Sequence, residues 1–271
     1  LLMMPCNSRH RGFTIIELVM VIVIMGVIGG MVAVFMKSPI DAYLATGRRA
    51  ALTDVADTTV RRMARDIRKA LPNSLRVPTA QCVEFIPTKT GGRYRADLGL
   101  AGAGDILNFA AADTSFNMLG SNNALPLDQR IAQEDLIAVY NLGVTGSNAY
   151  NQDNTSRVSA TPVDGTETSI SIDSKLFPLA SGGNRFHVIP STEKVVAYVC
   201  SGNKLFRTTS TTFTSDCPAT GAVLADKVSA CSFVYNGTDL QRNALVQLTI
   251  KFTDSGETVG LYQEVHVDNT P

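Results

Sequence analysis

The residue near the start of the chain that is best placed to do chemistry is an acid inside an apolar run. Residues 12–19 read GFTIIELV, and Glu17 follows Phe13 by four positions. A charged group at the centre of a membrane helix costs about 2.5–3.5 kcal/mol on insertion scales. Because the chain keeps this acid, we expect a partner for its charge.

The element that must position Glu17 is a long apolar helix. Residues 13–36 are apolar apart from Thr14, Glu17 and three glycines, and about 18 or more such residues are typical of a membrane helix. Arg9 and Arg11 precede the run, and the positive-inside rule places them on the cytoplasmic side. An ordinary signal anchor would explain the run but not Glu17. A signal peptide removed whole would need a small-residue cleavage site after the run, and none is convincing.

A second, amphipathic part of the helix is predicted over residues 37–71. Apolar residues recur there mostly at spacings of three, four and eight, which marks one face of a helix. That face comprises Leu44, Leu52, Val55, Thr59, Met63, Ile67 and Leu71. Pro39 predicts a bend near residues 35–40, because proline removes one helical hydrogen bond. Pro72 predicts the end of the helix.

The remaining residues, 72–271, predict a β-rich globular head. Short apolar runs alternate there with turn residues, which is typical of strands. The predicted strands are Cys82–Ile86, Asp105–Ala110, Leu136–Leu142, Arg185–Pro190, Val195–Cys200, Lys204–Thr208, Val228–Tyr235, Leu245–Thr253 and Thr258–Val267. The last two flank the turn residues 254–257 and predict an antiparallel hairpin. Residues 87–104, 111–130 and 143–168 are rich in small and polar residues, which predicts surface loops.

The cysteines favour an oxidising compartment. Cys6 lies before the apolar run, and the even number that follows comprises Cys82, Cys200, Cys217 and Cys231. Four cysteines allow three pairings, and disulfides persist in the periplasm but rarely in the cytosol. We favour Cys200–Cys217, which closes a short loop, together with Cys82–Cys231. Zinc is the competing interpretation, but there is no CxxC pair and no histidine at ligand spacing.

Charge is balanced over the whole chain but not along it. Lys+Arg and Asp+Glu are both 24. Residues 37–76 carry nine bases and four acids, whereas residues 77–271 carry 13 bases and 19 acids. An acidic head argues against nucleic-acid binding. The basic stretch is interpreted either as a solvated helix face or as a surface that pairs with acidic neighbours or anionic lipid.

Motifs typical of catalysis are absent from the head. It contains no G-x-S-x-G and no phosphate-binding loop. His187 and His266 lie in predicted strands, where a packed or surface role is the simpler interpretation. The acids Asp128, Glu134 and Asp135 lack the spacing of a calcium-binding EF-hand. We therefore expect no enzyme activity, no cofactor and no metal.

The string from Gly12 to Val19 resembles the processing site of type IV prepilins and type II secretion pseudopilins, the class III signal peptide. The resemblance implies a leader over residues 1–12, cleavage by a prepilin peptidase between Gly12 and Phe13, and methylation of the Phe13 amine. It also implies that Glu17 assists assembly. We expect its carboxylate to pair with the Phe13 amine of the same chain or of an adjacent subunit, because an isolated buried ion is costly.

The resemblance implies an α+β, pilin-like fold in which a long N-terminal helix packs on an antiparallel β-sheet head. The helix has two halves: a transmembrane or filament-core half (13–36) and an amphipathic half (37–71).

A narrower similarity, carried by residues 41–68, 82–95 and 228–236, points to minor pilins of MSHA pilus biogenesis, which belong with the J-like minor pseudopilins and W-like minor pilins. Implied partners are other pilins, the prepilin peptidase and an inner-membrane assembly platform. Implied location is the inner membrane, with a periplasmic head, and then the filament or its tip. A type II secretion pseudopilin and a ligand-binding tip module stay open as alternatives.

Overall fold

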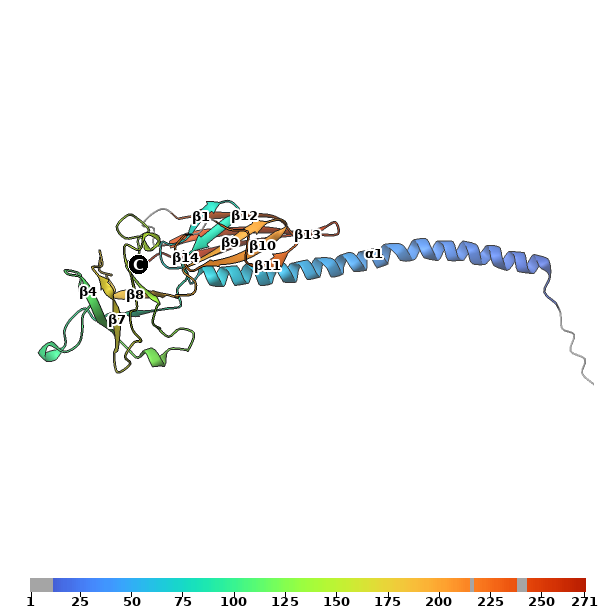
Figure 1. The fold of residues 1–271 in the computed structure, drawn as a ribbon. Helices are drawn as coiled ribbons and strands as arrows, with labels where there is room; N and C mark the ends of the chain where they lie inside the picture. The colour runs from blue at the N-terminus through green and yellow to red at the C-terminus, as the bar shows by residue number, and fades with distance from the viewer. Residues whose placement is uncertain (1–11, 215–216, 238–242) are drawn as a thin grey trace, which may run out of the picture. The chain divides into compact units, whose positions relative to one another are not determined.

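The computed structural model describes residues 12–214, 217–237 and 243–271 (Figure 1). The chain divides into two compact units, of which the first ends at Ala50 and the second spans Ala51–Pro271. Apart from Gly12, the predicted leader over residues 1–12 lies outside the described residues, as does Cys6.

The first unit is dominated by the helix α1, which spans Ile15–Ile67 and continues into the second unit. Its apolar residues are good membrane-helix formers, and its glycines are tolerated because the helix satisfies its own backbone. The helix continues through Pro39, so this proline removes one hydrogen bond without ending the helix. The bend expected at residues 35–40 stays a prediction.

The second part of α1 buries one face against the head. The buried residues are Leu52, Ala56, Thr59, Val60, Met63, Ala64 and Ile67. The predicted apolar face is therefore buried at Leu52, Thr59, Met63, Ile67 and Leu71. It is wrong at Leu44 and Val55, which are 50 % and 43 % exposed. The α-helix ends four residues before the predicted Leu71. There the Leu71 N–H donates to the Ile86 carbonyl at 2.8 Å instead of continuing the helix.

Two antiparallel sheets pack with α1. The first has the order β1-β2-β9-β10-β11, with bounds Arg76–Thr79, Cys82–Phe85, Val195–Ser201, Lys204–Ser210 and Ala222–Asp226. The second has the order β12-β13-β14, with bounds Val228–Asn236, Asn243–Asp254 and Glu257–Asp268. One core joins them to the helix, with Met63, Phe85, Tyr198 and Phe252 among its members.

A second β region fills the middle of the chain. Its four-stranded sheet has the order β3-β8-β5-β6, with bounds Thr90–Arg93, Arg185–Ile189, Leu136–Val139 and Thr155–Arg157. Its two-stranded sheet joins β4 and β7, which span Asp113–Met118 and Thr168–Lys175. Three short 3₁₀ helices span Leu100–Gly102, Asn122–Ala124 and Ala149–Asn151. This region has its own core, which includes Phe116, Val139 and Phe186, and Figure 1 shows β4, β7 and β8 grouped away from β9 to β13.

The C-terminal hairpin forms as predicted. β13 and β14 pair from Asn243↔Asp268 to Asp254↔Glu257. Ser255 and Gly256 both have positive φ, 49° and 86°, as a two-residue hairpin turn of type I′ requires. The alternate residues Val246, Leu248, Ile250 and Phe252 are fully buried, so one face of β13 lies in the core.

The structure corrects one predicted strand and three predicted loops. Residues 105–110 form no strand, although Leu107 is buried in the second core. The predicted loops at 87–104, 111–130 and 143–168 contain β3, β4, β6 and the start of β7. The strands β1 and β11 and the rest of β7 are also missing from the predicted set. The other predicted strands and the α+β class, a long helix packed on antiparallel sheets, are confirmed.

Candidate assembly site

Thr14 and Glu17 cap the start of α1 together. The Thr14 backbone N–H and hydroxyl each donate to Glu17 Oε2 at 3.3 Å, and the Glu17 N–H donates to Thr14 Oγ1 at 3.4 Å. This reciprocal arrangement is a capping box, which satisfies helix N–H groups that have no partner inside the helix. The Thr-x-x-Glu spacing of this box is a sequence signal from which the cap could have been predicted but was not. Among the described residues, Glu17 Oε1 accepts no hydrogen bond.

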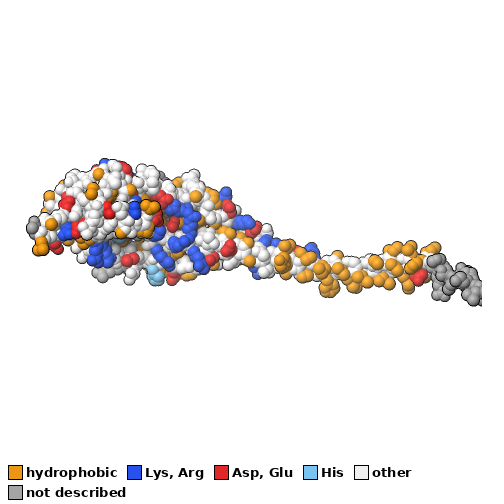
Figure 2. Space-filling view, turned by 90° about the horizontal axis from the view of Figure 1, so that it is seen from below, with side chains coloured by type: hydrophobic (Ala, Val, Ile, Leu, Met, Phe, Trp, Pro, Cys, Tyr) orange, Lys and Arg blue, Asp and Glu red, His pale blue; other side chains and the backbone are white. Residues whose placement is uncertain are grey.

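The helix after this cap is bare of packing partners in the first unit. Each large apolar side chain from Phe13 to Met36 is at least 45 % exposed, and Figure 2 shows apolar side chains along this stretch. By length and composition α1 is able to cross a membrane. This part of α1 therefore has a long apolar surface, with one acid near its start, that is accessible to lipid or to other helices.

A basic face follows on the part of α1 that belongs to the second unit. Arg61, Arg62 and Arg65 are exposed on the helix, and Arg68 and Lys69 are exposed in the turn after it. At about 100° per residue, these five positions fall within roughly a third of the helix circumference. Arg61 pairs with Asp57 at 2.8 Å. The other four make no ion pair with any described residue.

A charged network joins α1 to the five-stranded sheet. Asp66 Oδ2 accepts from the Tyr198 hydroxyl at 2.6 Å and from Arg207 Nε at 3.0 Å, and the Arg207 fork also donates to Glu193 at 3.1 and 3.2 Å. Burial and the Asp66 contact raise the pKa of Tyr198. Burial opposes the charge of Arg207, but its bonds to Glu193 and Asp66 outweigh burial and raise its pKa. The network holds the helix on the sheet, and these hydrogen bonds and ion pairs engage the side chains of both Asp66 and Arg207.

The disulfides correct the predicted pairing. The structure joins Cys82 to Cys217 and Cys200 to Cys231, whereas we expected Cys82–Cys231 and Cys200–Cys217. The reason is strand register: Cys82 lies opposite Val199, so the next residue, Cys200, points to the other face of the sheet. Cys200 and Cys231 contact the main core, while Cys82 and Cys217 contact Ala197 and Val199.

The residues considered for metal binding have other partners. Cys82, Glu84 and Cys217 place three donor atoms within 4.8 Å of one another, but the disulfide leaves the two sulfurs no thiolate to offer. Asp135 pairs with Lys89, and Glu134 pairs with Arg157 at 2.6 Å. Asp128 lines a different hollow, beside Lys69 and Glu193. The three acids therefore do not converge on one point.

His187 lies on β8 opposite Gly91 and Ala138. Its Nε2 is buried and has no hydrogen-bond partner among the described residues. Burial, aided by the charge of Arg185 and opposed by that of Asp268, lowers its pKa to about 4. A neutral, packed imidazole fits the interpretation made from the sequence. His266 lies opposite Leu245 on β14 and is exposed.

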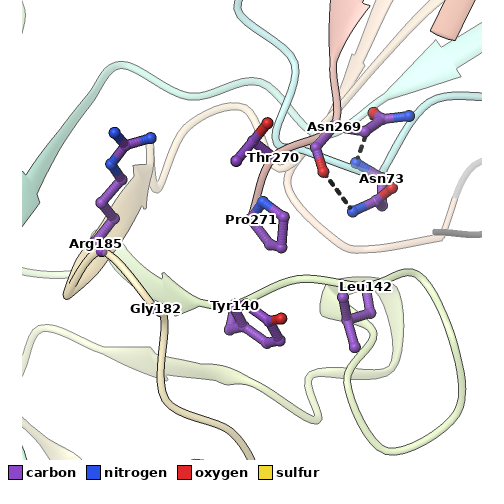
Figure 3. A pocket seen from close by; sticks show the side chains of 9 residues that line it. Asn73, Tyr140, Leu142, Gly182, Arg185, Asn269, Thr270 and Pro271 are labelled. Carbon is purple, nitrogen blue, oxygen red and sulfur yellow. Dashed lines mark hydrogen bonds between the residues drawn. The ribbon is translucent and has the colours of Figure 1, made fainter. Parts of the chain in front are cut away.

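A surface hollow of about 420 Å³ lies where Asn73 and the C-terminal residues 269–271 meet the second β region (Figure 3). It is lined by Asn73, Tyr140, Leu142, Gly182, Gly183, Arg185, Asn269, Thr270 and Pro271. The Asn73 backbone N–H donates to Asn269 Oδ1 at 3.0 Å, and Asn73 Nδ2 donates to the Asn269 carbonyl at 3.1 Å. These hydrogen bonds join the segment after α1 to the C-terminal end of the chain.

Residues 7–33 match the family model described as the prokaryotic N-terminal methylation motif. No curated protein and no solved structure matches the chain. The matched segment includes Gly12, Phe13, the capping pair and most of the exposed apolar run. Together with the long helix packed on antiparallel sheets, it supports the class of type IV pilin-like or pseudopilin-like subunits. Proteins of this class are structural subunits that are anchored by the N-terminal helix and assemble with other pilins at a membrane platform.

Proposed function

We propose that the chain is a minor pilin that takes part in biogenesis of an MSHA-like type IV pilus, of the MshO type. A prepilin peptidase removes the leader after Gly12 and methylates the Phe13 amine. The mature subunit sits in the inner membrane with residues 72–271 in the periplasm. It then primes or caps a filament built from other pilins.

The observation that carries the proposal is the state of Glu17 at the start of an exposed apolar helix. One carboxylate oxygen serves the helix cap, and the other accepts no hydrogen bond from any described residue. A half-satisfied carboxylate in an apolar surface is costly. The amine of Phe13 on an adjacent subunit supplies the missing partner when the helices bundle, and it sets the axial register of the growing filament.

Processing is tested first, in cells, with Gly12→Val and a matched glycine control. Gly26→Ala changes a glycine of the apolar run at a position where a Cβ meets nothing within 4 Å. We expect the wild type and Gly26→Ala to yield a mature N-terminal peptide that begins with methylated Phe13, and Gly12→Val to keep its leader. Mass spectrometry of the envelope protein reads this directly. Recovery of wild-type protein with its leader attached would contradict the proposal.

The type II secretion pseudopilin is the alternative, because it uses the same processing and the same helix. Co-purification separates the two. The membrane-extracted chain is captured by a C-terminal tag after mild cross-linking, and its partners are identified by mass spectrometry. Pilus subunits among the partners support the minor pilin, whereas secretion components support the pseudopilin.

A further inference from the structure

The two disulfides of the head lie in opposite chemical surroundings. Cys82 and Cys200 come from the neighbouring strands β2 and β9 but point to opposite faces of the five-stranded sheet. Cys82–Cys217 ties an outer loop to the sheet. Cys200–Cys231 joins β9 to β12 and is the disulfide between the two sheets of the main core within the described residues.

Burial and charge protect Cys82–Cys217. Cys82 is 1 % exposed, whereas its partner Cys217 is half-buried, so burial shields one sulfur of this bridge and neither cysteine of Cys200–Cys231. Glu84, two residues along the same strand, has a fully buried side chain, and a carboxylate oxygen of it lies within 4.8 Å of both sulfurs. Arg76 pairs with one oxygen of Glu84, and the other, Oε2, is buried without a hydrogen bond among the described residues. Arg76 offsets part of the Glu84 charge, and the unpartnered oxygen disfavours both an incoming thiolate and the thiolate that must leave.

The surroundings of Cys200–Cys231 are the reverse. Both cysteines are half-buried and line an open surface hollow of about 340 Å³, together with Asn203, Lys204 and Ser229. Lys204 brings a cation to the rim, and its nearest acid, Asp226, lies 3.9 Å from its Nζ. No acid lines the hollow itself. A small thiol can enter here, and the local charge favours an anionic one.

We propose that Cys200–Cys231 is the thiol-exchange site of this protein, opened by small thiolates or by the cysteine of a thiol–disulfide oxidoreductase, while burial and Glu84 keep Cys82–Cys217 closed. A thiolate attacks one sulfur of the bridge, forms a mixed disulfide and releases the other cysteine as a thiolate, which takes a proton from water. A second thiolate then attacks the mixed disulfide, releasing the second cysteine and the oxidised disulfide of the reagent. Opening removes the covalent link between β9 and β12.

The test uses the full chain in detergent, with both bridges formed, and reduced glutathione as the probe at mildly alkaline pH. Samples are quenched with acid over time, new thiols are alkylated, and peptides that contain each cysteine are quantified by mass spectrometry. We expect Cys200 and Cys231 to be labelled about tenfold faster or more than Cys82 and Cys217, since access and charge both favour the first pair. Equal rates, or faster opening of Cys82–Cys217, would overturn the proposal.

The part played by Glu84 is tested separately with Glu84→Gln. Glu264→Gln is the matched control, because it removes an exposed acid on β14. We expect Glu84→Gln to speed the opening of Cys82–Cys217 severalfold and to leave Cys200–Cys231 unchanged. An unchanged rate of opening of Cys82–Cys217 would show that the Glu84 carboxylate does not protect this bridge. The order of opening in the wild type decides the main claim even where Glu84→Gln folds poorly.

Discussion

Glu17 has two separable functions at the scale of single residues, a helix cap and a negative charge. Gln at position 17 keeps the capping box, because its amide oxygen accepts the same hydrogen bonds, but it carries no charge. Thr14→Ala does the opposite, since it loses the capping hydroxyl at a cost of about 0.5–2 kcal/mol and keeps the acid. The pair of variants therefore distinguishes a structural acid from one that pairs with a neighbouring subunit.

The first prediction concerns incorporation into filaments. We expect Glu17→Gln to be processed normally and to reach sheared filaments at a level at least about tenfold below wild type, because one pairing between an amine and a buried carboxylate is lost. We expect Thr14→Ala to be incorporated almost as well as wild type. Immunoblots of filament and membrane fractions measure both. Normal incorporation of Glu17→Gln would leave capping as the whole role of this acid.

The second prediction concerns the depressed pKa of His187, about 4. An ordinary histidine has a pKa near 6.5, so between these values the unfolded chain binds a proton that the folded head does not. The contribution of this group to stability is therefore full above about pH 6.5 and falls as the pH drops toward 4, by about 3.4 kcal/mol at most. The charged groups that act on the ring are Arg185 and Asp268.

The variant His187→Gln isolates this effect. Carboxylates also titrate at the lower end of the window, but they do so in both proteins. We expect the stability of the variant to vary less between pH 6.5 and 4 than that of the wild type, as measured by urea unfolding at several pH values. Parallel curves for the two proteins would show that the imidazole is not the responsible group.

At the scale of elements, the packed part of α1 is held by few large side chains. Met63 is fully buried among residues of the helix and both sheets, whereas Val55 is 43 % exposed. We expect Met63→Ala to destabilise the head by about 2–5 kcal/mol through the lost contacts and the cavity left behind. Val55→Ala is the control and should stay within about 0.5 kcal/mol. Thermal unfolding of the solubilised chain compares them.

The basic face of α1 predicts an effect on assembly rather than on stability. Arg62 and Arg65 are exposed and have no ion-pair partner among the described residues. We expect Arg62→Glu with Arg65→Glu to leave unfolding nearly unchanged and to reduce capture of partner pilins severalfold, because the partner would present acids there. Co-purification measures the capture.

A control with the same change in net charge completes this test. Arg93→Glu with Lys251→Glu reverses two exposed bases on β3 and β13. Equal loss of partners in both double variants would indicate a general charge effect and not a docking face. Loss of binding to anionic vesicles, with partner capture intact, would assign the face to lipid instead.

The elements that the sequence predicted are those whose pattern is complete within one segment. The strand β13 alternates cleanly, and its apolar face is buried. The short strands of the second β region carry no such pattern: β3 reads TGGR and β6 reads TSR, so their pairing comes from neighbours distant in the chain. Residues 105–110 were apolar enough for a strand but make only isolated backbone hydrogen bonds: the Leu107 N–H donates to the Arg95 carbonyl at 3.1 Å, and the Asp105 carbonyl accepts from the Asn117 N–H at 2.9 Å.

The candidate site divides in the same way. Gly12, Phe13 and Glu17 could be read from the sequence because their spacing is local, and Thr14 could have been added from the same four residues. The disulfide pairing could not, because it depends on which face of β9 carries Cys200, and one residue of register reverses that face. The ion pairs of Glu84 and Arg207 could not be predicted either, because the fold brings these residues to partners that are not their neighbours in the sequence.

At the scale of the whole molecule, the contacts of residues 51–271 form one compact unit with its own core. We expect this segment, made without the apolar run in an oxidising compartment, to be soluble and folded with Cys82–Cys217 and Cys200–Cys231 both formed. Circular dichroism and mapping of the bridged peptides check this. Recovery of the segment only as an aggregate, or with the bridges exchanged, would mean that the head needs the first part of α1 to fold.

The interleaved order of the bridges along the chain has a consequence for biosynthesis. Cys200 separates Cys82 from its partner Cys217, and Cys217 separates Cys200 from Cys231. A polypeptide that emerges N-terminus first and is oxidised as it appears would join Cys82 to Cys200 before either correct partner is available. Such a mistaken bond must be undone by reshuffling, so maturation of this protein should depend on a disulfide isomerase and not on an oxidase alone.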